Sequence, residues 1–345
     1  MLRLLPLLVL LAAAAPIAAQ TVRGAVVDEG GSPVAAAFVV LLDVEGRPAA
    51  RGLSHAGGGF LLHAGMAGTY TLRAERIGFE STVTPPLRLE QGAVVETRVT
   101  VSSRAVALDA IVVGGAAQCA VRARDDAAAA ALWEEARKAL AVSAWTERAE
   151  SLQVVAARWE RELDRQGMFI LAERRDSIVG RLQTPFRSLP AEELAAAGYR
   201  REESDGAWYY APDAEVLLSD SFLDTHCFRA VRGRGRARGL VGLAFEPVRG
   251  RSVPDVAGTL WLDARSAELR HLEFRYRNLP RQDDWPGVGG RIEFRRLPGG
   301  QWIVDRWRLR MPLVRHPRRG RATLAGYAEV GGQVHSAAPA PGGEG

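Results

Sequence analysis

The chain has 345 residues, 47% of them apolar, and a formal net charge of +5. This length favours two domains, and the apolar fraction is large enough for packed cores. The positive charge comes from arginine, because Lys138 is the only lysine. We attribute it to biased amino-acid usage and expect no nucleic-acid partner. A basic protein of this kind still favours anionic surfaces, such as lipopolysaccharide or phospholipid headgroups.

The first residues have the three parts of a secretory signal peptide. Arg3 supplies a positive charge, residues 4–15 are apolar, and small residues lead to a cleavage site near Ala19. The apolar segment is short for a bilayer-spanning helix, which disfavours the alternative of an uncleaved anchor. We therefore expect residues 1–19 to be removed and the protein to be exported, to the periplasm, the outer membrane or the cell surface. We expect no transmembrane segment after removal of the signal.

Two cysteines, Cys119 and Cys227, form an even pair. In an oxidising compartment this favours a disulfide. Such a bond would close a loop of about a hundred residues and stabilise the fold by about 4–5 kcal/mol in the chain-entropy model. The alternative is two free buried thiols.

Residues 21–103 have the pattern of a small β-sandwich. The stretch Gly57–Phe79 illustrates it, because apolar residues alternate along two predicted strands and glycines mark every reversal of the chain. About seven short strands at this spacing are typical of a sandwich.

Six segments of this region resemble the carboxypeptidase regulatory-like domain, a prealbumin-like β-sandwich also grouped with carbohydrate-binding-like folds. The resemblance covers about a quarter of the chain and implies an accessory module. Such modules stand beside zinc carboxypeptidase domains or at the N-terminus of bacterial outer-membrane receptors and surface proteins. The segments are Gly24–Asp28, Gly31–Val34, Ala37–Leu41, Gly59–Phe60, Gly68–Leu72 and Ile77–Phe79.

Residues 104–124 are predicted to be a linker that ends in a short strand. Within it, Leu108–Gly115 is similar to the segment that leads into the plug of TonB-dependent receptors. The rest of the chain departs from those receptors, because it is too short for a large barrel and contains no plug-like sequence.

Residues 125–332 are predicted to form an α+β domain with a long helix and a large antiparallel sheet. The helix is expected over about 125–165, where apolar residues recur at three- and four-residue spacing up to Leu163. The later strands alternate apolar residues with arginine and glutamate, as around Phe274 and Trp307, which indicates one solvated face. Residues 333–345 are predicted to be a disordered tail.

A helix followed by a one-sided antiparallel sheet is also the order of LolA-type lipoprotein carriers, whose curved sheet holds acyl chains. This likeness is architectural only. The alternative, which we favour, is that the long helix covers the apolar face, since an open apolar sheet face is costly.

The sequence carries no zinc carboxypeptidase motif, because no histidine is followed by glutamate at the third position. We therefore assign no catalytic residue, no cofactor and no metal site. The densest polar cluster contains Asp220, Asp224 and His226. These residues are weak candidates for metal binding or for acid–base catalysis. Their structural interpretation is that Asp220 caps a turn and Asp224 holds His226.

We expect a non-catalytic exported envelope protein with a binding or accessory role. Its expected partner is a carbohydrate, a lipid or another envelope protein. One alternative is a hydrolase, with or without a metal ion, centred on the polar cluster. The other alternative is a LolA-like carrier of lipid or lipoprotein.

Overall fold

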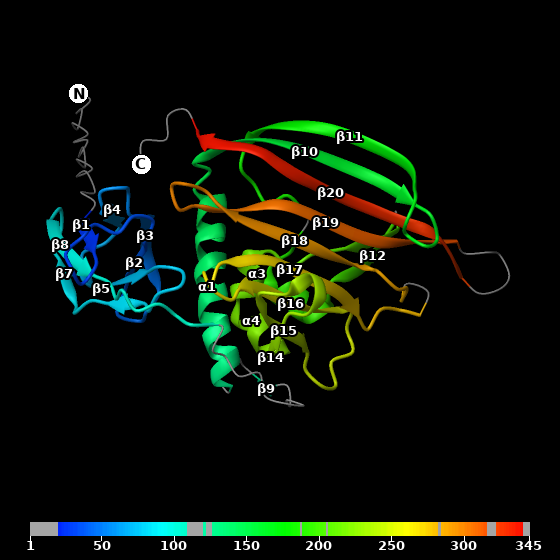
Figure 1. The fold of residues 1–345 in the computed structure, drawn as a ribbon, viewed down its shortest axis with the longest axis horizontal. Coiled ribbons are helices and arrows are strands. Elements are labelled where there is room, and N and C mark those ends of the chain that lie inside the picture. Colours follow the sequence, from blue (N-terminus) through cyan, green and yellow to red (C-terminus); the bar gives the residue numbers. More distant parts are fainter. Residues whose placement is uncertain are drawn as a thin grey trace, which may run out of the picture.

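The structure is a computed structural model that describes residues 20–108, 120–121, 126–186, 188–204, 206–281, 284–315 and 322–340. An N-terminal β-sandwich stands beside a larger domain built on a ten-stranded sheet (Figure 1). The predicted mainly-β fold class is thereby confirmed. The predicted signal peptide and Cys119 lie outside the described residues. Within the described ranges, no helix has the length and apolar character needed to cross a membrane.

The N-terminal domain consists of two packed sheets. One has the strand order β4-β1-β8, and the other has the order β3-β2-β5-β6 with β7 paired to β5. Strands β1 and β8 are parallel, and the remaining pairs are antiparallel. The strands are β1 (Gln20–Val27), β2 (Phe38–Leu42), β3 (Pro48–Leu53), β4 (Gly59–Ala64), β5 (Gly68–Glu75), β6 (Thr82–Val83), β7 (Leu87–Leu89) and β8 (Val94–Thr100).

The second domain is organised by one antiparallel sheet, whose strand order is β11-β10-β20-β19-β18-β17-β16-β15-β14-β9. Most neighbours follow each other along the chain, so most of the sheet is a simple meander. The strands are β9 (Ala120–Val121), β10 (Leu152–Leu163), β11 (Ile170–Arg181), β14 (His226–Arg232), β15 (Leu240–Pro247), β16 (Asp255–Asp263), β17 (Leu269–Arg277), β18 (Gly289–Arg296), β19 (Trp302–Arg315) and β20 (Thr323–Pro339). A separate hairpin joins β12 (Arg200–Glu203) to β13 (Gly206–Tyr209).

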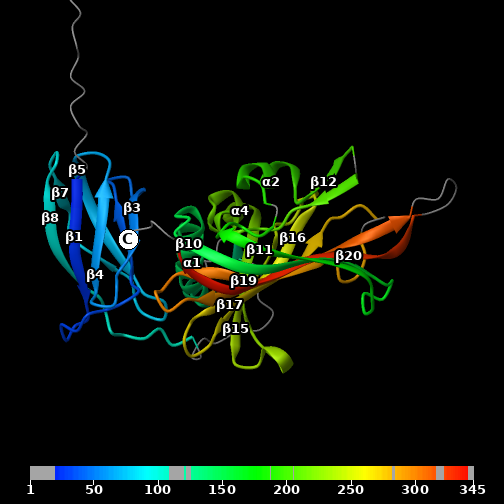
Figure 2. The same cartoon turned by 90° about the horizontal axis from the view of Figure 1, so that it is seen from above.

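Helices cover one face of this sheet (Figure 2). They are α1 (Ala127–Arg148), α2 (Ala191–Ala197), α3 (Ala214–Leu218) and α4 (Asp220–Thr225), with a 3-10 turn at Gly235–Ala237. Helix α1 begins at Asp126, whose carboxylate accepts the free N–H groups of the first turn. It contacts strands β14 to β17 and β19. Phe274, Ile292 and Trp307 are buried in the core below the helices, so the apolar face is covered, as the favoured alternative predicts.

The predicted helix over residues 125–165 is correct only for its first half. Helix α1 ends at Arg148, and residues 152–163 form strand β10 between β11 and β20. The cause is a shared spacing, since residues four apart lie on one face of a helix and also on one face of a strand. Leu152 and Ala156 have this spacing, and both are buried by the sheet.

The predicted disordered tail is also wrong where the structure describes it. Strand β20 continues to Pro339 and pairs with β10 from Leu163 to Leu152. Val334 is buried beside Ile303 in a small core on the other face of the sheet. Long-range pairing therefore orders a segment whose small residues and proline indicate no structure locally.

The two domains are packed against each other through strand β2. Val39 and Leu41 face the core of the sandwich, whereas Phe38, Val40 and Leu42 join the core of the second domain. The Phe38 ring centroid lies 5.7 Å from that of Trp145 in α1. A strand that is buried on both faces explains why this sequence is an unbroken apolar run.

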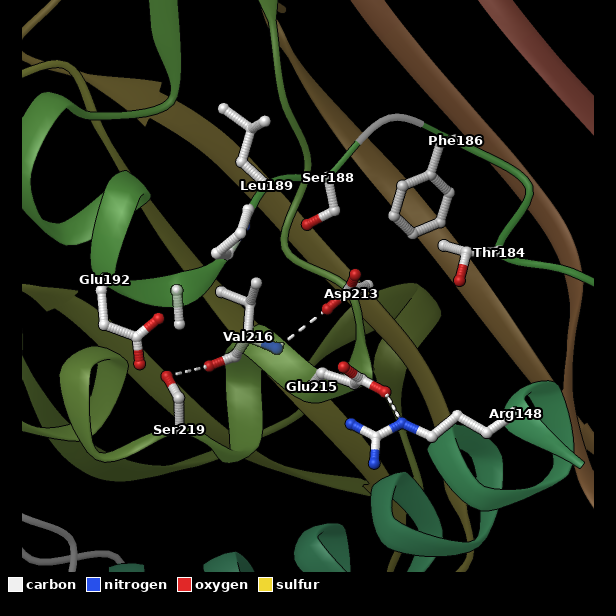
Figure 3. Close-up of a pocket in the computed structure, with 12 residues that line it drawn as sticks. Arg148, Thr184, Phe186, Ser188, Leu189, Glu192, Asp213, Glu215, Val216 and Ser219 are labelled. Carbon is white, nitrogen blue, oxygen red and sulfur yellow. Dashed lines mark hydrogen bonds and ion pairs between the residues drawn. The ribbon is translucent and has the colours of Figure 1, made fainter. Parts of the chain in front are cut away.

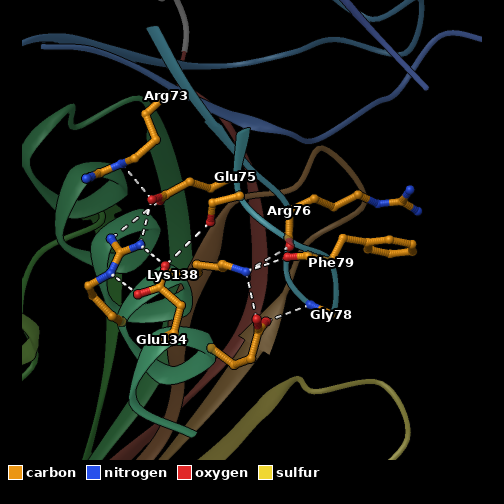
Figure 4. A network of polar contacts seen from close by, with 10 residues as sticks. Arg73, Glu75, Arg76, Gly78, Phe79, Glu134 and Lys138 are labelled. Atoms are coloured by element: carbon orange, nitrogen blue, oxygen red, sulfur yellow. Dashed lines mark hydrogen bonds and ion pairs between the residues drawn. The ribbon is translucent and has the colours of Figure 1, made fainter. Parts of the chain in front are cut away.

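A buried polar network completes the contact (Figure 4). The Nζ atom of Lys138 donates to the carbonyl oxygen of Phe79 at 2.6 Å and lies 2.7 Å from the Glu135 carboxylate. The second Glu135 oxygen accepts the N–H of Gly78 at 2.7 Å. The side chains of Lys138 and Glu135 are each 2% exposed. The only lysine of the chain is thus fully engaged in joining the domains.

A second ion pair lies beside the first. Arg137 donates to Glu75 at the end of β5 at 2.6 Å and to Glu134 at 2.6 Å. Burial opposes the charged form of Arg137, but both carboxylates outweigh burial and raise the pKa of this guanidinium above its ordinary value.

Candidate functional site

A pocket of about 660 Å³ opens between the end of α1, the segment 184–192 and helix α3 (Figure 3). Its volume is in the range of small-molecule sites, about 300–1,000 Å³. The lining combines hydroxyl groups, carboxylates, one guanidinium and one aromatic ring. The residues that line it are Arg148, Thr184, Phe186, Ser188, Leu189, Pro190, Ala191, Glu192, Asp213, Glu215, Val216 and Ser219.

Short helices hold the floor of the pocket. The Asp213 carboxylate accepts the N–H of Val216 at 2.8 Å and caps α3. The Ser219 hydroxyl accepts the N–H of Phe222 at 3.1 Å and caps α4. Across the opening, Arg148 from the last turn of α1 pairs with Glu215. Three sequence-distant segments therefore fix the polar groups around one cavity.

Glu147, the residue before Arg148, does not line the pocket but contacts a residue that does. Its carboxylate accepts the Thr184 hydroxyl at 2.7 Å. Burial and the negative charges of Asp213 and Glu215 raise the pKa of Glu147 to about 7, although the Thr184 hydrogen bond acts in the opposite direction. Burial also raises the pKa of Asp213 above its ordinary value. Both carboxyl groups therefore bind protons more readily than an exposed carboxyl group does.

The polar cluster that the sequence predicts does not form a shared site as the pocket residues do. Asp220 and Asp224 are exposed on α4, whereas His226 is buried at the start of β14. The Nδ1 atom of His226 faces the carbonyl oxygen of Phe222 at 3.0 Å, and Nε2 faces that of Val256 at 3.1 Å. Within the described ranges, no three His, Cys, Asp or Glu residues are grouped to hold a metal ion.

The structural roles in this cluster also differ from the expected ones. The cap of α4 is Ser219, not Asp220. Asp255, from the distant strand β16, lies 3.2 Å from Nε2 of His226 and also pairs with Arg251. Strand pairing places Cys227 opposite Val121, two residues after Cys119. The disulfide itself stays a prediction, because Cys119 is not among the described residues.

Sequence reasoning missed the pocket, because its residues are spread over α1, a connecting segment and two short helices. Glu147 and Arg148 have the spacing of ordinary solvent-facing helix residues. The one local signal is the Pro212-Asp213 step before an apolar turn, which is a typical start of a short helix. It indicates a capping aspartate and says nothing of the neighbours that surround it.

Comparison with known families decides the identity of the first domain. Residues 21–102 match the family described as carboxypeptidase regulatory-like domain. The N-terminal sandwich is a carboxypeptidase regulatory-like domain. The match ends two residues after β8, so the carboxypeptidase regulatory-like domain is the part of the chain that docks on α1 through β2 and Gly78.

No curated protein matches the chain. Solved structures give only distant likenesses. An ancillary pilin of Streptococcus is 11% identical over 51% of this chain and 57% of its own, with a TM-score of 0.22. A DUF1329 family protein from Desulfovibrio piger is 10% identical over 60% of this chain and 94% of its own, with a TM-score of 0.25. The chain spans little more than half of the pilin, and these scores carry no argument about fold or function.

Proposed function

We propose that this protein is a non-catalytic exported protein of the cell envelope that binds a carbohydrate in the pocket of the second domain. The carboxypeptidase regulatory-like domain supports an accessory role. In this proposal it acts as a fixed support, since β2 and the buried Lys138–Glu135 pair hold it against α1.

The pocket lining is the observation that carries this proposal. Sugar hydroxyls both donate and accept hydrogen bonds, and the pocket offers them the hydroxyl oxygen of Thr184 and the carboxylate of Glu192. Phe186 provides an apolar ring of the kind that packs against the C–H face of a sugar. A concave site with a few polar groups and an aromatic wall fits a neutral, hydroxyl-rich ligand better than a long acyl chain.

The helical cover of the sheet disfavours the lipid-carrier alternative. A carrier holds acyl chains against an open apolar sheet face, and α1 and α4 lie over that face at strands β14 to β17 and β19. The exposed apolar side chains of β11, such as Leu171 and Val179, lie outside this cover. Purification with bound phospholipid would reverse this preference.

Retention on insoluble peptidoglycan tests the binding proposal. We expect the mature protein to be retained, and expect Thr184→Val with Glu192→Ala to weaken retention by about tenfold, the loss expected from one to two hydrogen bonds. Asp224→Ala is the matched control, because Asp224 is an exposed carboxylate outside the pocket lining. Equal retention of all three proteins would exclude the pocket as the binding site.

A second candidate function is glycoside hydrolysis beside the pocket, because Glu147 accepts a hydrogen bond from the lining residue Thr184 and has a pKa raised to about 7. Such enzymes use one protonated and one ionised carboxyl group. Release of new reducing ends from peptidoglycan, lost in Glu147→Gln while retention persists, would support this candidate over simple binding. The hydrolase hypothesis centred on Asp220, Asp224 and His226 would instead require loss of turnover in Asp224→Asn.

A further inference from the structure

Strand β11 is the free edge of the ten-stranded sheet (Figure 1). It is 12 residues long and pairs with β10 along its inner edge. Every residue of β11 except Gly180 is exposed. Long edge strands present unpaired backbone N–H and C=O groups and readily pair with another strand.

Apolar side chains make this edge unusual. Leu171 and Val179 are each 66% exposed, and Ile178 is 41% exposed. Phe169, in the turn that leads into the strand, is 68% exposed. Natural edge strands are commonly protected by charges or by proline, and here four charged residues occupy the middle of the strand and only Arg181 lies at an end.

The residue pattern of β11 is symmetrical about Arg175. Leu171 and Val179 lie four residues to either side of Arg175, and both are apolar. Asp176 and Arg174 lie one residue to either side and have opposite charges. Two antiparallel copies centred on this arginine therefore place apolar residues opposite apolar residues and arginine opposite aspartate.

We propose that the outer edge of β11 binds a second copy of this chain, with the two β11 strands antiparallel about a two-fold axis at Arg175. The pairing joins the two sheets into one continuous sheet, with the helices of both copies on the same face. Leu171 lies opposite Val179 of the other copy, and Ala172 lies opposite Ile178. Each such pair occurs twice because the interface is isologous.

Charges in the middle of the strand fit this arrangement. Arg174 already lies 3.0 Å from Asp176 within its own strand, so two copies form a ring of four alternating charges. Arg175 meets its own copy at the axis, but it pairs with Glu173. Glu173 also accepts a hydrogen bond from Arg161 at 3.2 Å. The like charges at the axis are therefore each compensated within their own copy.

Neighbouring registers are worse. A slip of one residue in one direction sets arginine against arginine and Glu173 against Asp176, and like charges directly opposite each other are destabilising. A slip of one residue in the other direction sets Glu173 against Ile178 and Leu171 against Gly180, which removes apolar pairs. A slip of two residues sets Leu171 against Ser177 and Ala172 against Asp176. The charges and the apolar pairs thus select the register together.

Charge reversal tests the proposal with the full mature chain in analytical ultracentrifugation. We expect the wild type to sediment with twice the monomer mass at high concentration. Arg174→Glu alone and Asp176→Arg alone should each weaken the dimer on the order of tenfold or more, because two cross-strand attractions become repulsions. A mixture of the two single variants should dimerise again, since each acid then faces an arginine.

The mixture separates pairing between copies from effects within one chain, because the two substitutions sit in different molecules. Arg23→Glu is the control, since Arg23 is an exposed ion-paired residue of the other domain, and it should leave the mass unchanged. A wild type that stays monomeric overturns the proposal and leaves β11 to a strand of another protein. A dimer that both single variants retain, or a mixture that stays monomeric, also overturns it.

Discussion

Substitution of Lys138 by methionine is expected to weaken the whole molecule, because this side chain joins the two domains. Lys138 and Glu135 are each 2% exposed, and Nζ is bonded to the carboxylate and to the carbonyl oxygen of Phe79. Lys138→Met has a similar length but leaves the Glu135 charge buried and unpaired. Loss of one partner from such a pair costs about 3–5 kcal/mol in free energy of unfolding.

A second substitution identifies the source of this loss. Glu135→Gln in the Lys138→Met background removes the unpaired charge, while the amide oxygen can still accept the N–H of Gly78. We expect the double variant to be more stable than Lys138→Met, with a remaining loss of about 1–3 kcal/mol for the carbonyl that has no donor.

Urea denaturation measures both effects. All eight tryptophans lie in the second domain, between residues 133 and 307, so their fluorescence follows that domain, and far-UV circular dichroism follows both. The midpoint should fall with little change in slope. The exposed pair Arg23–Glu96 provides the control, where Arg23→Met should change stability by less than about 1 kcal/mol. If Lys138→Met costs less than about 1 kcal/mol, or the double variant is the less stable one, the reasoning fails.

Three further outcomes are expected, each measured by urea denaturation. The pKa of Glu147 is about 7 in the folded protein against 4.5 as its ordinary value. Folding therefore favours the protonated form of Glu147, and the free energy of unfolding should fall as pH rises from about 4.5 to about 7. The Glu147→Gln variant should not show this fall. Above pH 7 it should be more stable than the wild type, by up to about 3 kcal/mol. Burial lowers the pKa of His271 from 6.5 to about 4. The free energy of unfolding should therefore fall as pH drops between these two values. If His271→Phe loses as much stability in acid as the wild type does, this explanation is wrong. In β1, a Cβ at Gly24 would lie 2.2 Å from the Thr97 carbonyl oxygen, so Gly24→Ala should cost about 2–3 kcal/mol or more, whereas Gly65→Ala, with nothing within 4 Å, should be nearly neutral.

The fold was predicted well where a local pattern has only one structural solution. Alternation around Phe274 and Trp307 allows a half-buried strand and no helix, and both residues lie in the sheet as expected. The ordered turns of the first domain allow a sandwich, and the family match confirms it. The prediction failed at Leu152–Leu163, where a spacing of four fits both a helix and a strand, and only the partners β11 and β20 select the strand.

The candidate site was beyond sequence reasoning for a different reason. Thr184 and Glu147 are bonded to each other across 37 residues, and Arg148 pairs with Glu215 across 67. Nothing in the local sequence of any of these residues indicates the other. Asp220, Asp224 and His226 attracted attention because they are close in sequence, yet the chain turns His226 into the core and leaves both aspartates at the surface.

The sequence by itself determined the elements whose patterns are local: the short strands of the sandwich, the start of α1 at its aspartate cap and the late meander. It also determined that β2 would be apolar on both sides, although not what would cover its second side. The tertiary structure decided that the domains dock through Lys138 and that residues 152–163 form a strand instead of a helix. It also decided which residues line the pocket. Each of these depends on partners that are distant in the chain, and the burial of charge and apolar surface that selects them exists only after the chain has folded.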